Sequence, residues 1–218
     1  MLIDLHMHEC TYSKDSVLTL ETIVKTARLK GLDGVCITDH DSMGLRSQAE
    51  AYSRKVDFPI FVGVEHYSLQ GDIVAFGLDK APDHRMEAQA FIDLVKSQGG
   101  VCFAAHPFRN NNRGLEELLA QVRGLDGIEA FNASASPEAN LRALEYCRRL
   151  HLQPVGVSDC HVEEKIGHYA TFLPGEARSL KEFMELFRKG HCYPVAYGEE
   201  GYRPLIKPSV PSHNRITA

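Results

Sequence analysis

The chain has 218 residues, of which 44% are hydrophobic and 24% are charged, and its formal net charge is −5 with histidine neutral. This is ordinary globular composition, and the length suits one larger domain, such as an α/β barrel, or two small ones. The acidic balance argues against a strongly basic nucleic-acid-binding protein. No run of about 18 apolar residues predicts a membrane span. The N-terminus lacks a basic segment followed by an apolar run, so we expect no secretory signal and a cytoplasmic protein.

Short apolar runs alternate with segments of helical spacing along most of the chain. The runs that predict strands are 2–8, 34–40, 59–68 paired with 72–78, 101–107, 127–132, 153–159 and 168–174. The segments that predict helices are 19–31, 45–56, 84–100, 114–124, 136–150 and 179–190. This alternation predicts a parallel sheet covered on both faces, either a closed barrel or an open doubly wound sheet.

Glycine-rich nucleotide-binding loops and paired cysteines are absent from the sequence. No G-x-G-x-x-G or Walker-type loop occurs, which argues against the usual nucleotide-binding folds. Six cysteines occur without a C-x-x-C pair, which argues against a zinc ribbon. We expect most of them to be buried thiols. Residues 199–218 carry prolines, serines and polar residues without periodicity, and we interpret them as a surface tail or arm.

Ionisable and polar side chains gather at the end of one expected strand after another. In chain order they are His6 and His8, Asp39 and His40, Glu65 and His66, His106, Glu129 and Asn132, and Asp159 and His161. In parallel α/β folds this edge of the sheet is the common active-site face. Side chains that are far apart in the sequence are therefore expected to converge there.

The first of these pairs, in "DLHMH", indicates a metal site. His6 and His8 lie two residues apart on a strand, so they point the same way. Such a pair is a weak signal alone, but the repetition of His, Asp and Glu clusters at successive strand ends favours a metal centre. Histidine with carboxylate suits Zn²⁺, Mn²⁺ or Fe²⁺. The candidate ligands are His6, His8, Asp15, His40, Glu65, His106, Asp159 and His161. They are more than one ion needs, which favours two or three ions.

Taken together, the motifs "DLHMH", "YSKDS", "ITDHDSMG", "GVEHYS", "AAHP", "SDCH" and "IGHYATF" resemble the polymerase-and-histidinol-phosphatase (PHP) family, from Leu2 to about Gly190. The resemblance implies an α/β fold of one domain, a distorted TIM-like (β/α)7 barrel over 1–198 with a C-terminal arm over 199–218. It also implies a trinuclear metal centre that cleaves phosphate esters. One ion would bind His6, His8, Glu65 and Asp159, a second would share Glu65 and take His106, and a third would use Asp15, His40 and His161.

A few positions depart from the family pattern or admit two interpretations. Asp72 stands where many small members have a histidine, and it is either an oxygen ligand or a solvated turn residue. Cys160 is either a ligand or a buried spectator. Asp15 is otherwise a helix cap or turn residue, and Asp39 is expected to orient an imidazole.

The resemblance and the residues together predict a metal-dependent phosphoesterase. A water that bridges two ions would lose a proton and attack phosphorus. Arg109 is either a phosphate-binding group or a surface arginine. His168 is either the proton donor to the leaving group or a structural histidine.

Two other functions are consistent with the same residues. One is an amidohydrolase that cleaves C–N bonds, although no lysine stands at a strand end. The other is a metal-depleted PHP module that acts as a structural or interaction domain. The expected partner is a small phosphorylated substrate, with nucleic acid only as a short or terminal substrate and no membrane.

Overall fold

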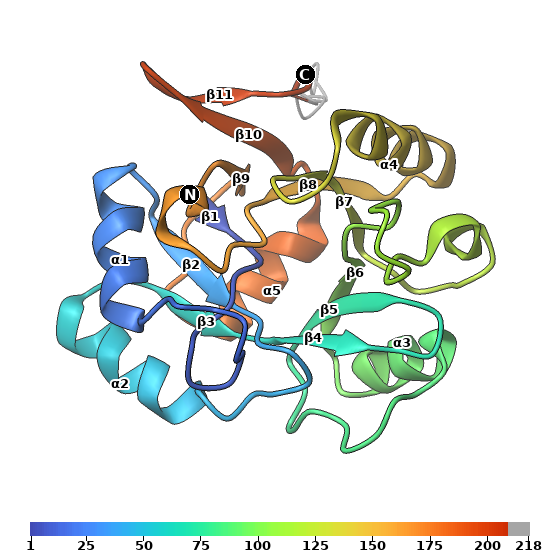
Figure 1. Ribbon diagram of the computed structural model, residues 1–218, viewed down its shortest axis with the longest axis horizontal. Coiled ribbons are helices and arrows are strands. Elements are labelled where there is room, and N and C mark those ends of the chain that lie inside the picture. Colours follow the sequence, from blue (N-terminus) through green and yellow to red (C-terminus); the bar gives the residue numbers. More distant parts are fainter. Residues whose placement is uncertain (209–218) are drawn as a thin grey trace, which may run out of the picture.

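In the computed structural model, which describes residues 1–208, the apolar runs assemble into two sheets (Figure 1). One sheet has the spatial order β11 (Gly201–Pro204), β10 (Tyr193–Gly198), β9 (Tyr169–Phe172), β1 (Leu2–Asp4), β2 (Gly34–Ile37) and β3 (Ile60–Val62). The other has the order β4 (Val64–Tyr67), β5 (Asp72–Phe76), β6 (Val101–Ala104), β7 (Gly127–Asn132) and β8 (Gln153–Val157). The helices are α1 (Leu20–Leu29), α2 (Arg46–Val56), α3 (Ala88–Ser97), α4 (Pro137–Leu150) and α5 (Leu180–Lys189).

The prediction of a parallel sheet is only partly correct. Strands β1, β2 and β3 pair in parallel, as do β6, β7 and β8. Strand β5 is antiparallel to both of its neighbours, and β9, β10 and β11 form antiparallel pairs at the other end. The link between β4 and β5 is only a few residues long, and such a short link permits an antiparallel pair but not a crossover.

The run 59–68, predicted as one strand, is divided between the two sheets at Gly63. Strand β3 ends at Val62 in one sheet, and β4 begins at Val64 in the other. A Cβ atom at Gly63 would lie 2.5 Å from the Ala75 carbonyl oxygen and 2.6 Å from the Phe76 ring. The chain therefore passes between the sheets at a position where no side chain fits.

The two sheets approach each other without closing into a hydrogen-bonded barrel over the described residues. Isolated bridges join Met7, after β1, to Cys160, after β8, and His40, after β2, to Glu65 in β4. The α/β fold in one domain agrees with the prediction, whereas the (β/α)7 barrel is not confirmed.

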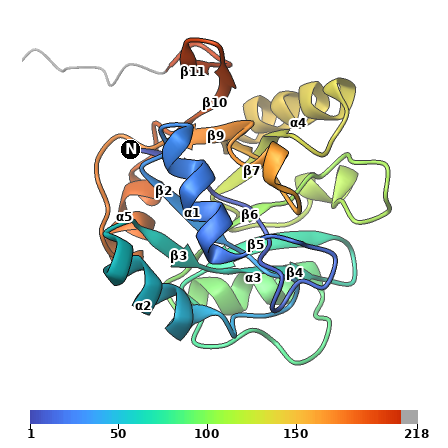
Figure 2. The ribbon, with the colours of Figure 1, turned by 60° about the vertical axis from the view of Figure 1, so that its left-hand side comes forward.

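Helix α5 packs between the sheets, and the other helices cover their outer faces. The Phe183 ring of α5 lies 5.3 Å from the Phe61 ring in one sheet and 5.0 Å from the Phe76 ring in the other. Figure 2 shows α1 and α2 side by side along one flank. Strands β2 and β6 are buried along their whole length, which confirms that both faces are covered.

Two further segments differ from the sequence-based expectation. The run 114–124, predicted as an α-helix, forms only a short 3₁₀ helix, Glu116–Ala120. Part of the predicted C-terminal arm is strand β11, which pairs with β10, while 209–218 lie outside the described residues. Within the described part of the chain, no helix is long and apolar enough to cross a membrane.

Candidate metal centre

The polar residues at the strand ends form one cluster, and backbone hydrogen bonds between the segments that follow the strands set its register. The Asp159 N–H, after β8, donates to the His6 carbonyl, after β1, at 2.9 Å. On the other side of the cluster, His40 after β2 is bridged to Glu65 in β4. Main-chain contacts thus bring together side chains that are widely separated in the sequence.

The first two histidines point their Nε2 atoms at each other, 3.0 Å apart. His6 Nδ1 lies 2.7 Å from Glu129 Oε1, so we assign the ring proton to Nδ1. Ser13 donates its only hydroxyl proton to Asp39 Oδ1 at 2.8 Å, so at 3.2 Å it accepts one from His8 Nδ1. Both rings then direct Nε2 into the cluster, where this nitrogen can bind a metal ion in its deprotonated form.

Glu65 is buried at the centre of the cluster, where it faces four imidazole rings. Its Oε1 lies 2.9 Å from His106 Nε2 and 3.6 Å from His6 Nε2. Its Oε2 lies 2.7 Å from His40 Nδ1 and 3.6 Å from His8 Nε2. A carboxylate in this position is suited to bridging two cations.

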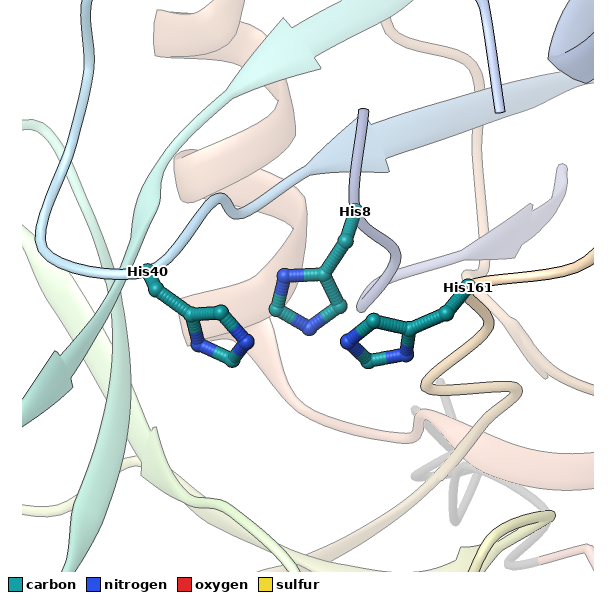
Figure 3. Close-up of side chains that lie close together, drawn as sticks. All are labelled: His8, His40 and His161. Atoms are coloured by element: carbon teal, nitrogen blue, oxygen red, sulfur yellow. The ribbon is translucent and has the colours of Figure 1, made fainter. Parts of the chain in front are cut away.

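Three histidines from separate segments gather at the outer side of the cluster (Figure 3). The His8 ring centroid lies 4.2 Å from the centroids of His40 and His161. Asp15 Oδ2 lies 3.2 Å from His40 Nε2 and 3.3 Å from His161 Nε2. The exposed Asp15 carboxylate therefore spans the two outer rings at the rim.

The electrostatics of the cluster favour positive charge at its centre. Burial lowers the pKa of His6, but Glu129, Glu65 and Asp159 outweigh it and hold that pKa well above its ordinary value. Burial lowers the pKa of His8 to about 4, which keeps this ring neutral near pH 7. Burial raises the pKa of Asp159, but the neighbouring His6 and His8 outweigh it and keep that pKa low. The carboxylates that favour a charged imidazole would equally favour a metal cation.

Unpaired atoms and strained backbone also fit a metal centre. His40 Nδ1 and Glu65 Oε2 are buried and only 2.7 Å apart, yet within residues 1–208 neither has a hydrogen-bond partner of acceptable geometry. His106 and Asp159 have φ angles of 26° and 47°, the left-handed region that non-glycine residues rarely adopt. Three groups have ligand atoms within 4.8 Å of one another: His8, His40 and His161; His6, His8 and Asp159; Glu65, Asp72 and His106. These donors suit Zn²⁺, Mn²⁺ or Fe²⁺.

Two arginines from the loop after β6 line the cleft beside the cluster. Arg109 Nη1 donates to Asp159 Oδ2 at 2.8 Å. Arg113 Nε and Nη2 donate to the two oxygens of Asp72 at 2.6 and 3.0 Å. Asp72 is thus buried and paired with an arginine, and it is not a solvated turn residue. The pairing with Arg113 was not anticipated, although this residue lies only four positions after Arg109.

Two further polar residues, Asn132 and Asp39, form hydrogen bonds that orient side chains of the cluster. Asn132, one of the polar residues expected at a strand end, donates to Glu129 Oε2 at 2.8 Å and to Asp159 Oδ2 at 3.2 Å, so it orients both carboxylates. Asp39 was expected to orient an imidazole. It contacts the Ser13 hydroxyl, which in turn orients the His8 ring.

The remaining predicted residues lie outside the cluster. His168 is exposed and packs edge-on against Tyr169, and it does not line the cleft formed by the described residues. The Cys160 side chain is buried in an apolar cluster, in keeping with a spectator thiol. All eight predicted ligands come together, and their binding of metal stays a prediction.

Comparison with known proteins agrees with this picture. A family described as PHP-associated matches residues 137–192. A Bifidobacterium adolescentis protein described as a metal-dependent phosphoesterase is 22% identical, with a TM-score of 0.63, covering 74% of this chain and 88% of its own. An amidohydrolase of Chromobacterium violaceum, solved with sulfate and no metal, is 20% identical, with a TM-score of 0.65; the match covers 85% of this chain and 96% of that protein. A lesion-specific endonuclease of Pyrococcus furiosus is 16% identical, with a TM-score of 0.65; the match covers 88% of this chain and 56% of that protein.

The fold and the cluster define an α/β protein with a histidine and carboxylate site at the strand ends. The PHP-associated match over residues 137–192 supports the resemblance of the motifs to the PHP domain family, and the structural neighbours share the fold.

Proposed function

We propose that the protein is a metal-dependent phosphoesterase that hydrolyses a phosphate ester of a small metabolite or nucleotide. The observation that carries the proposal is the set of three neighbouring ligand groups, two of which share His8, next to a cleft lined by two arginines. We further interpret the two adjoining sheets as a distorted (β/α)7 barrel that is open between β3 and β4 and between β8 and β1.

The proposed ligands follow the geometry of the cluster. One ion would be held by His6, His8, Glu65 and Asp159, and another by Asp15, His40 and His161 with His8 alongside. Glu65 and His106 remain as ligands for a further ion. When bound, divalent ions would lower the pKa of a coordinated water from 15.7 towards about 7 and offset charge on the phosphoryl oxygens.

The residues of the chain bind and orient the substrate. Arg109 is 33% exposed and lines the cleft, so a phosphoryl oxygen can reach its guanidinium group. Its bond to Asp159 places that group directly beside the candidate ligands. The His168 side chain is not among the described residues that line the cleft. Its role as proton donor to the leaving group stays a prediction.

An assay of released products tests the proposal. The purified protein is stripped with a chelator, reloaded with Mn²⁺, Zn²⁺ or Fe²⁺, and given phosphate monoesters and short nucleotides. We expect metal-dependent release of phosphate. Release of ammonia from amide substrates without release of phosphate would instead support an amidohydrolase, and failure to bind any metal would support an interaction module.

Replacement of His8 or Asp159 by alanine is expected to reduce turnover below detection. Each change removes a ligand at the centre of the cluster but leaves the apolar clusters intact, so the fold should persist. The measurements are kcat at saturating metal and the circular dichroism spectrum. His84→Ala and Asp83→Ala, at side chains that are 75% and 84% exposed, serve as matched controls. A wild-type rate in either cluster variant would refute the site assignment.

A further inference from the structure

The two arginines of the cleft bind their carboxylates in different ways. Arg109 contacts only Oδ2 of Asp159. The other oxygen, Oδ1, lies 3.7 Å from His6 Nε2 and 3.4 Å from His8 Nε2, so it still faces the Nε2 atoms of both rings. Asp159 therefore keeps one oxygen for an ion.

In Asp72, by contrast, both carboxylate oxygens already accept hydrogen bonds from an arginine. Arg113 donates to both of its oxygens, Nε to Oδ2 and Nη2 to Oδ1. Paired N–H donors of this kind match a carboxylate in geometry and in charge. Among the described residues, the other basic group close to Asp72 is His106, whose Nε2 lies 3.5 Å from Asp72 Oδ2 and 2.9 Å from Glu65 Oε1.

The backbone holds the Arg113 side chain in place. The Asp72 N–H donates to the Arg113 carbonyl at 2.7 Å, so the two residues are joined through main chain and side chain. The guanidinium carbon lies 4.5 Å from the centre of the Tyr67 ring, within the range of a cation–π contact. Next to it, a Cβ atom at Gly114 would lie 2.1 Å from the Pro107 carbonyl oxygen, which shows how closely the loop is folded.

We infer that Arg113 is a built-in cation that takes the place of a metal ion at the group formed by Glu65, Asp72 and His106. This inference rests on the proposed metal centre. It restricts the metal ions to the two ligand groups that contain His8, namely His8 with His40 and His161, and His8 with His6 and Asp159. A guanidinium at this position supplies fixed positive charge to the cleft. Unlike a metal ion, it cannot activate a coordinated water, because it offers N–H donors and no open coordination position.

Metal counting tests the inference without reference to activity. The full chain and its variants are stripped with a chelator, reloaded with Mn²⁺, desalted and analysed for ions per chain. Asp72→Asn is expected to bind as many ions as wild type, because Arg113 already occupies that carboxylate. Arg113→Ala is expected to bind about one ion more per chain, since Asp72 becomes free to act as a ligand. The double variant D72N/R113A is expected to return to the wild-type number.

A matched control and a folding check accompany these measurements. Arg142→Ala removes an exposed arginine that is paired with Glu117 on the outside of the molecule, and its ion count should equal that of wild type. Circular dichroism and thermal melting establish that each variant is folded. If Arg113→Ala does not fold, Arg113→Gln, which removes the charge but keeps a long polar side chain, takes its place with the same expected gain of one ion.

Specific outcomes would overturn the inference. Loss of one ion in D72N shows that Asp72 is a ligand, and an unchanged count in a folded Arg113→Ala shows that Arg113 excludes no ion. A wild-type chain that binds no ion overturns both this inference and the proposed function. Ion counts that follow the expected pattern in a protein without phosphoesterase activity would support the inference and refute the function.

Discussion

At the scale of single residues, a hydrogen-bond relay decides which nitrogen of His8 faces the cluster. Asp39 accepts from the backbone N–H of Glu9 at 2.7 Å and from Ser13 Oγ at 2.8 Å. Ser13 Oγ also accepts from the His40 N–H at 3.3 Å, so its lone pairs are engaged by His40 and His8. The relay thereby holds the His8 proton on Nδ1 and leaves Nε2 free for a metal ion.

Replacement of Ser13 by alanine is therefore expected to weaken metal binding by about 10- to 100-fold, the usual effect of losing a group that orients a ligand. Isothermal titration of the stripped protein with Mn²⁺ measures the change in Kd. Ser97→Ala, at an exposed serine of α3, should leave Kd unchanged. An unaltered Kd in the Ser13 variant would show that the relay does not control His8.

The candidate ligands other than Asp15 could be predicted because each stands at the end of a recognisable apolar run, whereas Asp15 was predicted from the loop motif "YSKDS". The positions of Glu129 and Asn132 were visible for the same reason, but their hydrogen bonds to His6 and Asp159 were not. The pairing of Asp72 with Arg113 depends on how the loop after β6 folds back across β5. A sequence without an alignment carries no signal for such a contact.

At the scale of secondary-structure elements, Gly63 determines where the chain leaves one sheet for the other. The Gly63 N–H donates to the Ile37 carbonyl at 2.9 Å, beyond which β4 places Glu65 at the centre of the cluster. A side chain here would meet the Ala75 carbonyl of β5. The position of the central carboxylate thus depends on a close backbone approach.

Replacement of Gly63 by alanine is expected to lower the free energy of unfolding by about 1–3 kcal/mol, because the added methyl group must displace backbone or the Phe76 ring. Urea denaturation measures this change. Gly198→Ala is the matched control, since its nearest non-neighbour atom would lie 3.9 Å from the new Cβ. Equal stability of the two variants would mean that the sheets separate easily at this point.

Elements with a strong local pattern were predictable, and their pairing was not. The helix 179–190 has a serine cap and a capping box at Ser179 and Glu182, and the structure begins α5 at Leu180. The run 59–68 reads as one strand because apolar residues flank Gly63 on both sides. Its division between two sheets, like the antiparallel pairing of β9 with β1, arises from contacts far apart in the sequence.

At the scale of the whole molecule, the apolar core and the polar cluster occupy different parts of the fold. Helix α5 fills the space between the sheets with Phe183 and Phe187, whereas the candidate ligands other than Glu65 lie beyond the strand ends. The cluster joins segments from both sheets, because His6 and His40 follow strands of one sheet and Glu65 and His106 belong to the other. Metal ions bound there would link the two sheets across their boundary.

Removal of metal is consequently expected to destabilise the whole fold. An ion that binds only the folded chain, at a free concentration 1,000 times its Kd, stabilises it by about 4 kcal/mol. For a chain of this size that corresponds to a fall in Tm of about 8–16 °C on chelation. Differential scanning calorimetry of the Mn²⁺-loaded and chelator-treated protein measures it, with His8→Ala as the variant that should respond little. A wild-type Tm that does not change on chelation would show that the cluster binds no ion strongly enough to join the two sheets.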